Sequence, residues 1–322
     1  MVVIPFAIYI TVQIMLLPLG IIGALLVTYR QLRVSQRLGL SQTAVEVLNG
    51  RWTMDVFGIR HDAAARKLAR VLPNDSIAGL WLALFPLYLL YRMTRRNYIY
   101  PRVPREGRES IADLVIVRTL YFDTLIAARL AAAEQSVILG AGLDTRFCGA
   151  LLEVSGLTMF ELDQANTQRM KRTRLHQAGL PTEHVRFVEV DFTEAGWTEG
   201  LLEAGFNPAA KTIFLWEGVT LYLDEADVAA TLGALRTIAA KGSVVFTDIY
   251  ADRFLHIGKK RGLAKTLEIT DEELRFGLDF TKDHDRILRQ FVQAQELRMG
   301  HAKFLGASTG SGPYAVVAEL LL

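Results

Sequence analysis

The segment Val137-Ile138-Leu139-Gly140-Ala141-Gly142 constrains the fold of this chain more than any other. A short apolar run ends in two glycines spaced by one residue, and a second apolar run, 157–162, ends in Asp163 twenty-one residues after Gly142. This spacing is typical of a first βαβ unit, in which glycines let the backbone approach a ligand and an acid on strand two accepts hydrogen bonds from ribose hydroxyls. The sequence therefore predicts a Rossmann-like, doubly wound α/β domain with a nucleoside site.

Thr145 stands where a dinucleotide-binding fingerprint has its third glycine. That glycine permits the close helix–strand packing that surrounds a pyrophosphate. A ribose site without a pyrophosphate cradle favours S-adenosyl-L-methionine over NAD. We therefore expect S-adenosyl-L-methionine as the cofactor, and an NAD-dependent oxidoreductase remains the alternative.

The C-terminal two thirds of the chain alternate apolar runs with helical patterns, which indicates a parallel sheet covered on both faces. We expect helices over 110–133, 144–155 and 224–240, a mostly helical insertion over 251–290, strands over 136–139, 158–162, 185–190, 212–216 and 243–247, and an antiparallel closing pair near 296–301 and 314–321. Small or acidic residues follow the parallel strands: Gly140, Gly142, Asp163, Asp191, Glu217 and Asp248. Ligands of such sheets bind at the carboxyl ends of the strands, so we expect these residues on one rim.

The first 29 residues carry no charged side chain. As a helix, 2–29 would be roughly 42 Å long, more than a bilayer core of about 30 Å requires. A signal peptide is disfavoured, because no basic residue precedes the run and no small-x-small site closes it. We expect a single-pass transmembrane anchor over 1–29, with a buried soluble helix as the alternative. Arg30, Arg33 and Arg37 follow directly, which predicts a membrane location with the catalytic domain in the cytoplasm.

Residues 30–105 contain 13 Lys or Arg against 4 Asp or Glu, whereas 106–322 contain 23 against 30. We interpret 30–106 as a basic helical cap with a membrane-proximal apolar segment, 77–91. We expect Trp81, Tyr88 and Tyr91 near lipid headgroups, with a core helix of the cap as the alternative. A nucleic-acid partner is disfavoured, since the basic region adjoins an apolar anchor and the domain over 107–322 is net acidic.

Three motifs together carry a family resemblance: Gly140-Ala-Gly-Leu-Asp-Thr-Arg146, Glu161-Leu-Asp-Gln164 and Trp216-Glu-Gly-Val-Thr-Leu-Tyr-Leu223. They resemble the leucine carboxyl methyltransferase family of class I S-adenosyl-L-methionine-dependent O-methyltransferases, which includes polyketide O-methyltransferases. Val117-Arg118-Thr119 with Asp123 resembles an upstream element of that family, and the likeness extends over roughly 41–322. The resemblance implies a seven-stranded sheet over 107–322 and an O-methyltransferase activity.

The resemblance also implies a cofactor site. Arg118, with or without Arg51, would hold the methionine carboxylate. Gly140 and Gly142 would lie under the amino-acid moiety, and Asp163 would bind the ribose. The remaining contacts would come from Asp191 and Phe192 near the adenine, and from Glu217 facing the cofactor.

The acceptor is expected to be a lipid-like or polyketide-like carboxylate or hydroxyl compound. A carboxylate needs no general base, whereas a phenol or enol would use one. Candidate bases are Tyr222, Asp248, Tyr250, Asp252 and His256. A catalytically inactive, membrane-tethered binding module is the further alternative.

Several of these residues also have a purely structural interpretation. Arg118 could pair with Asp123 within one helix, and Tyr222 could be a core aromatic. Asp144 and Arg146 are expected to form an ion pair that fixes the loop. The remaining expectations are a solvated basic face over 169–174, a packed Cys148 and no metal site.

Overall fold

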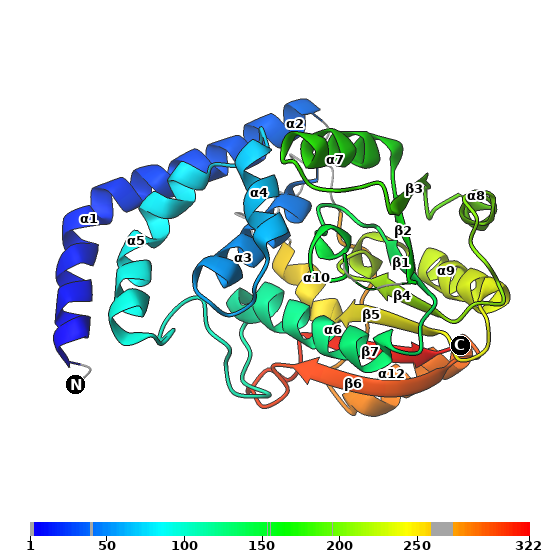
Figure 1. Cartoon of the computed structure of the whole chain (residues 1–322). Helices are drawn as coiled ribbons and strands as arrows, with labels where there is room; N and C mark the ends of the chain where they lie inside the picture. Colours follow the sequence, from blue (N-terminus) through cyan, green and yellow to red (C-terminus); the bar gives the residue numbers. More distant parts are fainter. Residues whose placement is uncertain (1–2, 39–40, 153, 155, 195, 259–272) are drawn as a thin grey trace.

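The chain folds around one seven-stranded sheet, shown in Figure 1. The computed structural model describes residues 3–38, 41–152, 154, 156–194, 196–258 and 273–322. The strands are β1 Gln135–Leu139, β2 Thr158–Asp163, β3 Val185–Glu189, β4 Thr212–Trp216, β5 Val244–Tyr250, β6 Arg298–Leu305 and β7 Ala315–Leu321. Their order is β3-β2-β1-β4-β5-β7-β6; the first five are parallel, and β7 runs antiparallel to both β5 and β6. The expected doubly wound sheet with an antiparallel closing pair is confirmed.

Alternating side chains of the strands fill cores on the two faces of the sheet. Val137 and Leu139 of β1 belong to one apolar cluster, and Ile138 between them belongs to the other. The first face carries α8 (Trp197–Glu203), α9 (Glu225–Ile238) and α12 (His284–Ala294), and the second carries α6 (Leu114–Leu130). Strands that are buried on both faces read as continuous apolar runs, which is why the sequence located them well.

A helical cap lies against the rim where the parallel strands end. It consists of α3 (Gln42–Val56) and α4 (Ala63–Val71), which share a third apolar cluster with Leu175 of α7 (Ala165–Gln177). Ser41 caps α3 by accepting the N–H of Ala44 at 3.1 Å, and Asp62 caps α4 by accepting the N–H of Ala65 at 2.8 Å. The caps fix where both helices begin, and so place their side chains over the glycine loop.

Two apolar helices lie beside the cap, with α1 (Val3–Tyr29) outermost and α5 (Ile77–Thr94) between α1 and the rest of the molecule (Figure 1). They run antiparallel and approach most closely at Gly23 and Gly79, where a Cβ on either glycine would lie 2.6–2.7 Å from the carbonyl oxygen of the other. After α1 the helical path continues through the π-helical turn η1 (Arg30–Val34) and α2 (Ser35–Leu38). Both 4–37 and 77–94 are long and apolar enough to cross a membrane by length and composition.

The structure shows which side of α5 contacts the cap. The Trp81 ring lies edge-on 5.4 Å from that of Trp52 in α3, and the Tyr88 and Tyr91 rings each lie 5.8 Å from that of Phe57, which follows α3. All three rings are half-buried, and their expected place near lipid headgroups stays a prediction. The apolar pattern alone does not specify this packing, because a helix packed between two others is as apolar as an interfacial one.

Two expectations about the elements need correction. The helix expected over 144–155 is a single 3-10 turn, η3 (Arg146–Cys148), followed by turns in its described part. The strand expected to end at 247 continues to Tyr250, so Asp248 lies within β5. In the insertion, α10 (Asp252–Gly258) and α12 are helical as expected, whereas the expectation for 259–272 lies outside the described residues.

Candidate functional site

The glycine loop after β1 and the end of β2 are joined through Asp163. Gly140 and Gly142 have φ angles of +65° and +46°, a region that favours glycine. The Asp163 carboxylate accepts the N–H of Gly142 at 2.6 Å and that of Gln164 at 2.7 Å. Burial raises the pKa of Asp163, and these two hydrogen bonds oppose the rise. The half-buried Asp163 carboxylate thus lies at the rim, as predicted for a ribose acceptor.

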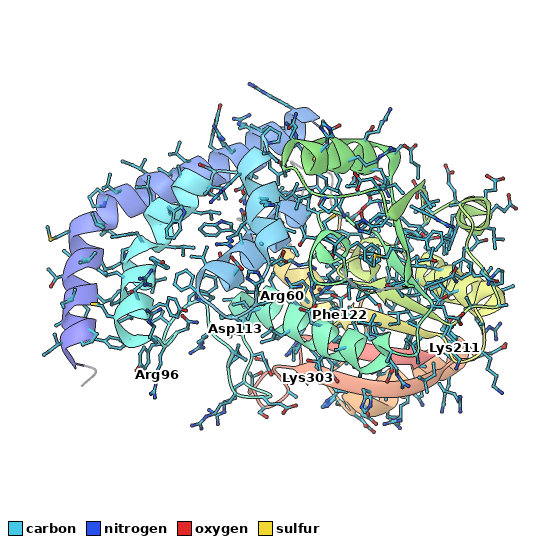
Figure 2. All side chains as sticks on the ribbon, in the orientation of Figure 1. Arg60, Arg96, Asp113, Phe122, Lys211 and Lys303 are labelled. Carbon is cyan, nitrogen blue, oxygen red and sulfur yellow. The ribbon has the colours of Figure 1, made fainter. Side chains whose placement is uncertain are left out.

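A buried ion network fills the space between the cap, α6 and the ends of β4 and β5. Its members are the arginines Arg51, Arg60, Arg118 and Arg146 and the carboxylates of Asp62, Asp123, Asp144, Glu217 and Asp248. We call this set the rim network. Figure 2 labels Arg60, whose side chain lies between α3 and α6. Five carboxylates against four arginines leave a formal excess of negative charge at the strand ends.

Glu217 is the centre of the rim network. Its carboxylate accepts hydrogen bonds from Arg146 at 2.8 Å and from Arg51 and Arg118 at 3.2 Å each. Although burial opposes ionisation, these three arginines hold the pKa of Glu217 below its usual value. The same balance lowers the pKa of Asp144, which pairs with Arg146 and with Arg51 at 2.8 Å. The expected ion pair between Asp144 and Arg146 is confirmed.

Arg118 of α6 extends its side chain to the ends of β4 and β5. Its guanidinium donates to Glu217, to Asp248 at 2.9 Å and to the hydroxyl of Tyr250 at 2.6 Å. Burial alone would lower the pKa of Arg118, but Tyr250 and the two carboxylates raise it, so the side chain stays charged. The alternative that Arg118 pairs with Asp123 is wrong, because Asp123 binds Arg60 and Arg146.

Two of the candidate bases, Asp248 and Tyr222, have different surroundings. Asp248 is fully buried, and its carboxylate accepts hydrogen bonds from Arg118, from the N–H of Gly218 at 2.8 Å and from Tyr250 at 2.7 Å. Burial raises the pKa of Asp248, and Arg118 opposes that rise. Tyr222 is half-buried and donates to Thr43 of α3 at 2.9 Å. Tyr222 therefore links the strand-four loop to the cap.

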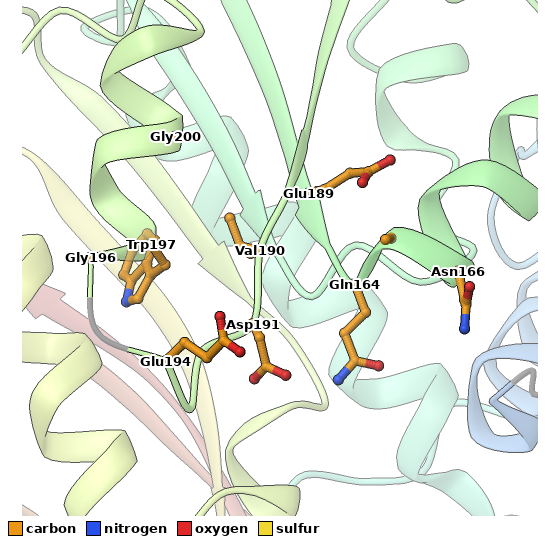
Figure 3. A pocket seen from close by; sticks show the side chains of 10 residues that line it. Gln164, Asn166, Glu189, Val190, Asp191, Glu194, Gly196, Trp197 and Gly200 are labelled. Carbon is orange, nitrogen blue, oxygen red and sulfur yellow. The ribbon is translucent and has the colours of Figure 1, made fainter.

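A cavity of about 620 Å³ opens beyond the ends of β2 and β3 (Figure 3). Gln164, Asp191, Glu194 and Trp197 are among the residues around it. Asp191 accepts the backbone N–H of Thr193 at 2.9 Å, and the ring of Phe192 contacts that of Trp197 edge-on at 5.3 Å. The residues expected near an adenine thus lie next to Asp163, at one end of the rim.

Some members of the site were not predicted. Arg60 and Asp62 reach the network from the turn before α4, whereas Tyr250, which was expected as a candidate base, reaches it from β5. Lys171 was assigned to a solvated face, but it is buried and pairs with Glu161 of β2 at 2.5 Å. The apolar neighbours of Glu161 within β2 were the available signal, because a glutamate inside a fully buried strand needs a cationic partner.

Cys148 is buried, as expected, and burial raises the pKa of its thiol to about 12. Among the described residues, no group of three or more His, Cys, Asp or Glu side chains could hold a metal ion. The side chain of His256 is not among those that the structure describes.

Fold and site together define a nucleoside-binding α/β protein of the methyltransferase type, and comparison with known proteins identifies its family. The leucine carboxyl methyltransferase family model matches residues 61–239. The chain therefore belongs to the leucine carboxyl methyltransferase family, and the resemblance seen in the sequence is confirmed.

Curated relatives agree with this assignment. The chain is 32% identical over 182 residues to a predicted S-adenosyl-L-methionine-dependent methyltransferase of Mycolicibacterium vanbaalenii, covering 55% of this chain and 59% of that protein. It is 34% identical over 217 residues to one of Mycobacterium avium, covering 67% of each. The first two relatives, from M. vanbaalenii and M. smegmatis, are each matched over only 59% of their length. The expected cofactor is confirmed at the level of this family.

Solved structures with a similar chain path share little sequence. An O-methyltransferase family protein from Burkholderia thailandensis has 16% identity and a TM-score of 0.44, with 64% of this chain and 57% of that chain covered. Magnesium protoporphyrin IX methyltransferase from Synechocystis has 14% identity and a TM-score of 0.41, with 72% and 93% covered.

Proposed function

We propose that this chain is an S-adenosyl-L-methionine-dependent O-methyltransferase that acts on a carboxylate or hydroxyl of a small amphiphilic, lipid-like or polyketide-like acceptor. The observation that carries the proposal is the position of Asp163, which lies between the glycine loop and the cavity at the ends of β2 and β3. A carboxylate there matches a ribose diol, and the cavity beyond it is lined by Asp191, one of the two residues expected near an adenine.

The residues present fit the cofactor at its other end as well. Nε and Nη1 of Arg51 are buried and have no hydrogen-bond partner among the described residues. An unpaired buried guanidinium donor is costly, and a carboxylate is its natural acceptor. Arg51 and Arg118 would therefore bind the methionine carboxylate, while Glu217 and the excess negative charge of the rim network suit the ammonium and sulfonium groups.

When bound, the cofactor supplies a methyl group on a positively charged sulfur. The protein contributes orientation and exclusion of water, because an in-line displacement needs little further help. Glu217 and Asp248 hold the guanidinium of Arg118 in place. The Asp248 carboxylate already accepts hydrogen bonds from Arg118, Gly218 and Tyr250 within the protein. This favours a role in positioning Arg118 over a role as a base. Tyr222 remains the candidate base for a hydroxyl acceptor, and a carboxylate acceptor needs none.

We propose further that α1 attaches the enzyme to a membrane by a single pass, with the catalytic domain in the cytoplasm. Twelve large hydrophobic side chains of α1, from Ile4 to Tyr29, are exposed. Arg33 and Arg37 follow and are exposed. Basic residues next to a membrane span favour the cytoplasmic side, which supports the proposed orientation. Since α5 packs on the cap through Trp81, we assign the single pass to α1 alone. An amphiphilic acceptor would then reach the enzyme from the lipid surface.

Two alternatives are less well supported. In an NAD-dependent oxidoreductase the position of Thr145 would be a glycine, but Thr145 is fully buried and its hydroxyl contacts Asp62 of the cap at 3.0 Å. An inactive tethered module would have lost ligand-binding side chains, whereas Arg118, Asp163 and Glu217 are all present.

Transfer of a tritium-labelled methyl group tests the function. Full-length protein is incubated with labelled cofactor and a membrane lipid extract, and the lipids are then separated. We expect label in the lipid fraction that is released as methanol by alkali if the acceptor is a carboxylate, or that resists alkali as an ether if it is a hydroxyl. Asp163→Asn should abolish transfer, and Asp285→Asn, on the exposed face of α12, should not. Label bound to carbon, or bound cofactor without any transfer, would refute the O-methyltransferase assignment.

A further inference from the structure

A second cavity lies away from the rim, between the apolar helices and the catalytic domain. It measures about 330 Å³, within the range of about 300–1,000 Å³ that small-molecule sites occupy. Val27 of α1 and Leu80, Ala83 and Leu84 of α5 form one wall, and Val115 and Ile116 of α6 lie opposite. Thr28 and Ala112, which are exposed, lie at its edge. The cavity is therefore apolar along two helices and open beside the exposed surface of α1.

Polar side chains line this cavity from one stripe of α3 and from Gln31 and Tyr100 outside it. Glu46, Asn49, Gly50 and Thr53 line it at helical positions i, i+3, i+4 and i+7, which share a face. Arg51 points from the other side of the same helix into the rim network. The cavity is thus separated by the body of α3 from the proposed site of methyl transfer.

Asn49 provides an observation that points to a ligand. It is 7% exposed, and its Nδ2 donates to Asp75 at 3.1 Å. Its Oδ1 is buried and has no hydrogen-bond partner within the described ranges. A buried carbonyl oxygen without a donor is unfavourable, so a ligand hydroxyl that donated to it would be stabilised. Glu46, at the exposed end of the same stripe, accepts a hydrogen bond from Nε2 of Gln42 at 2.8 Å.

We propose that this cavity binds a single-chain amphiphile with an uncharged, hydroxyl-bearing head, taken up from the membrane surface. Its hydrocarbon chain lies against α1 and α5, and its hydroxyl donates to Oδ1 of Asn49. No Lys, Arg or His side chain is among the described residues that line the cavity, so a carboxylate or phosphate head would meet no cationic partner there. The assignment does not depend on methyl transfer, since the ligand lies on the opposite side of α3 from Glu217 and Arg118.

Tryptophan quenching by a brominated chain tests the site. Trp81 adjoins the lining residue Leu80, and Trp52 adjoins Thr53, whereas Trp197 and Trp216 lie in α8 and β4. Full-length protein in detergent is titrated with 1-(9,10-dibromostearoyl)glycerol. We expect saturable quenching, and binding at least tenfold weaker in Ala83→Phe, which fills the cavity. Ala78→Phe, on the exposed side of the same helix, should bind as the wild type does.

A second variant and a second ligand distinguish loss of binding in the cavity from loss of the fold or of the rim site. Ala112→Phe narrows the exposed mouth without a change in the core and should also weaken binding. Binding of S-adenosylhomocysteine, measured on each variant, should stay unchanged and reports that the fold and the rim site are intact. Quenching that rises without saturation, or equally in wild type and Ala83→Phe, would overturn the site. Tighter binding of dibromostearate than of its glycerol ester would overturn the assigned head group.

Discussion

Arg146 is the side chain whose loss should harm the fold most within the rim network. It is 1% exposed and contacts three carboxylates: Asp123 at 2.9 Å, Glu217 at 2.8 Å and Asp144. Removing one partner of a buried ion pair costs about 3–5 kcal/mol, because the remaining charge stays buried. Arg51 and Arg60 still compensate these acids in part, so we expect about 3 kcal/mol for Arg146→Met.

The pH dependence of that loss follows from the carboxylates. The arginines hold the pKa values of Asp123, Asp144 and Glu217 below their usual values, so the resulting stability is present above about pH 4 and is lost as pH falls through the native-state pKa values. In Arg146→Met those pKa values rise. The difference in unfolding free energy between wild type and variant should therefore be largest near pH 7 and shrink toward pH 4.

Urea unfolding of the full-length protein in detergent, followed by circular dichroism, measures this difference. Arg289→Met is the matched control, because Arg289 forms an exposed i,i+4 pair with Asp285 at 2.6 Å. The Arg289→Met variant should unfold at the same urea concentration as the wild type, because exposed ion pairs contribute little to the free energy of unfolding. Two results would show that the rim network does not stabilise the fold in this way. Arg146→Met could unfold at the same urea concentration as Arg289→Met, or its loss of unfolding free energy could grow toward acid pH.

Three other predictions concern packing and titration. Gly79→Val should separate α1 from α5 and lower the melting temperature, whereas Ala78→Val should not; equal melting of the two would show that the close helix contact is unimportant. Burial raises the pKa of Glu161 to about 7 against the attraction of Lys171, so the contribution of Glu161 to stability falls as pH rises from about 4 to 7. In urea titrations between pH 5 and 8, the wild type should therefore lose unfolding free energy relative to Glu161→Gln. Parallel pH curves for the two proteins would contradict this. The Cys148 thiol should resist iodoacetamide at pH 8 until the protein is unfolded, and rapid labelling of native protein, read by mass spectrometry, would show that it is accessible.

Much of the sheet could be predicted because its strands are buried on both faces and end in distinctive residues. The strands that end at Leu139, Asp163 and Trp216 lie within one or two residues of their expected bounds. The glycine loop was recognisable for a similar reason, since a positive φ at Gly140 and Gly142 requires a residue without a side chain.

The rest depended on contacts between distant segments. Arg60 and Asp123 meet although 63 residues separate them, and nothing in either local sequence indicates the partner. The segment after Asp144 was expected to be helical, but an ion pair and a tight 3-10 turn replace the helix there. The place of α5 against Trp52 was likewise decided by packing that an apolar pattern does not specify.

Calorimetry with S-adenosylhomocysteine tests the central claim most directly. Full-length protein in detergent should bind S-adenosylhomocysteine with micromolar affinity and should not bind NAD. Asp163→Asn removes a charged acceptor for two ribose hydroxyls, and it should weaken binding by about 100-fold or more, since hydrogen bonds to charged groups contribute about 1.5–3 kcal/mol each. No binding of S-adenosylhomocysteine by the wild type, or equal affinity in Asp163→Asn, would contradict the assignment of this rim as the cofactor site.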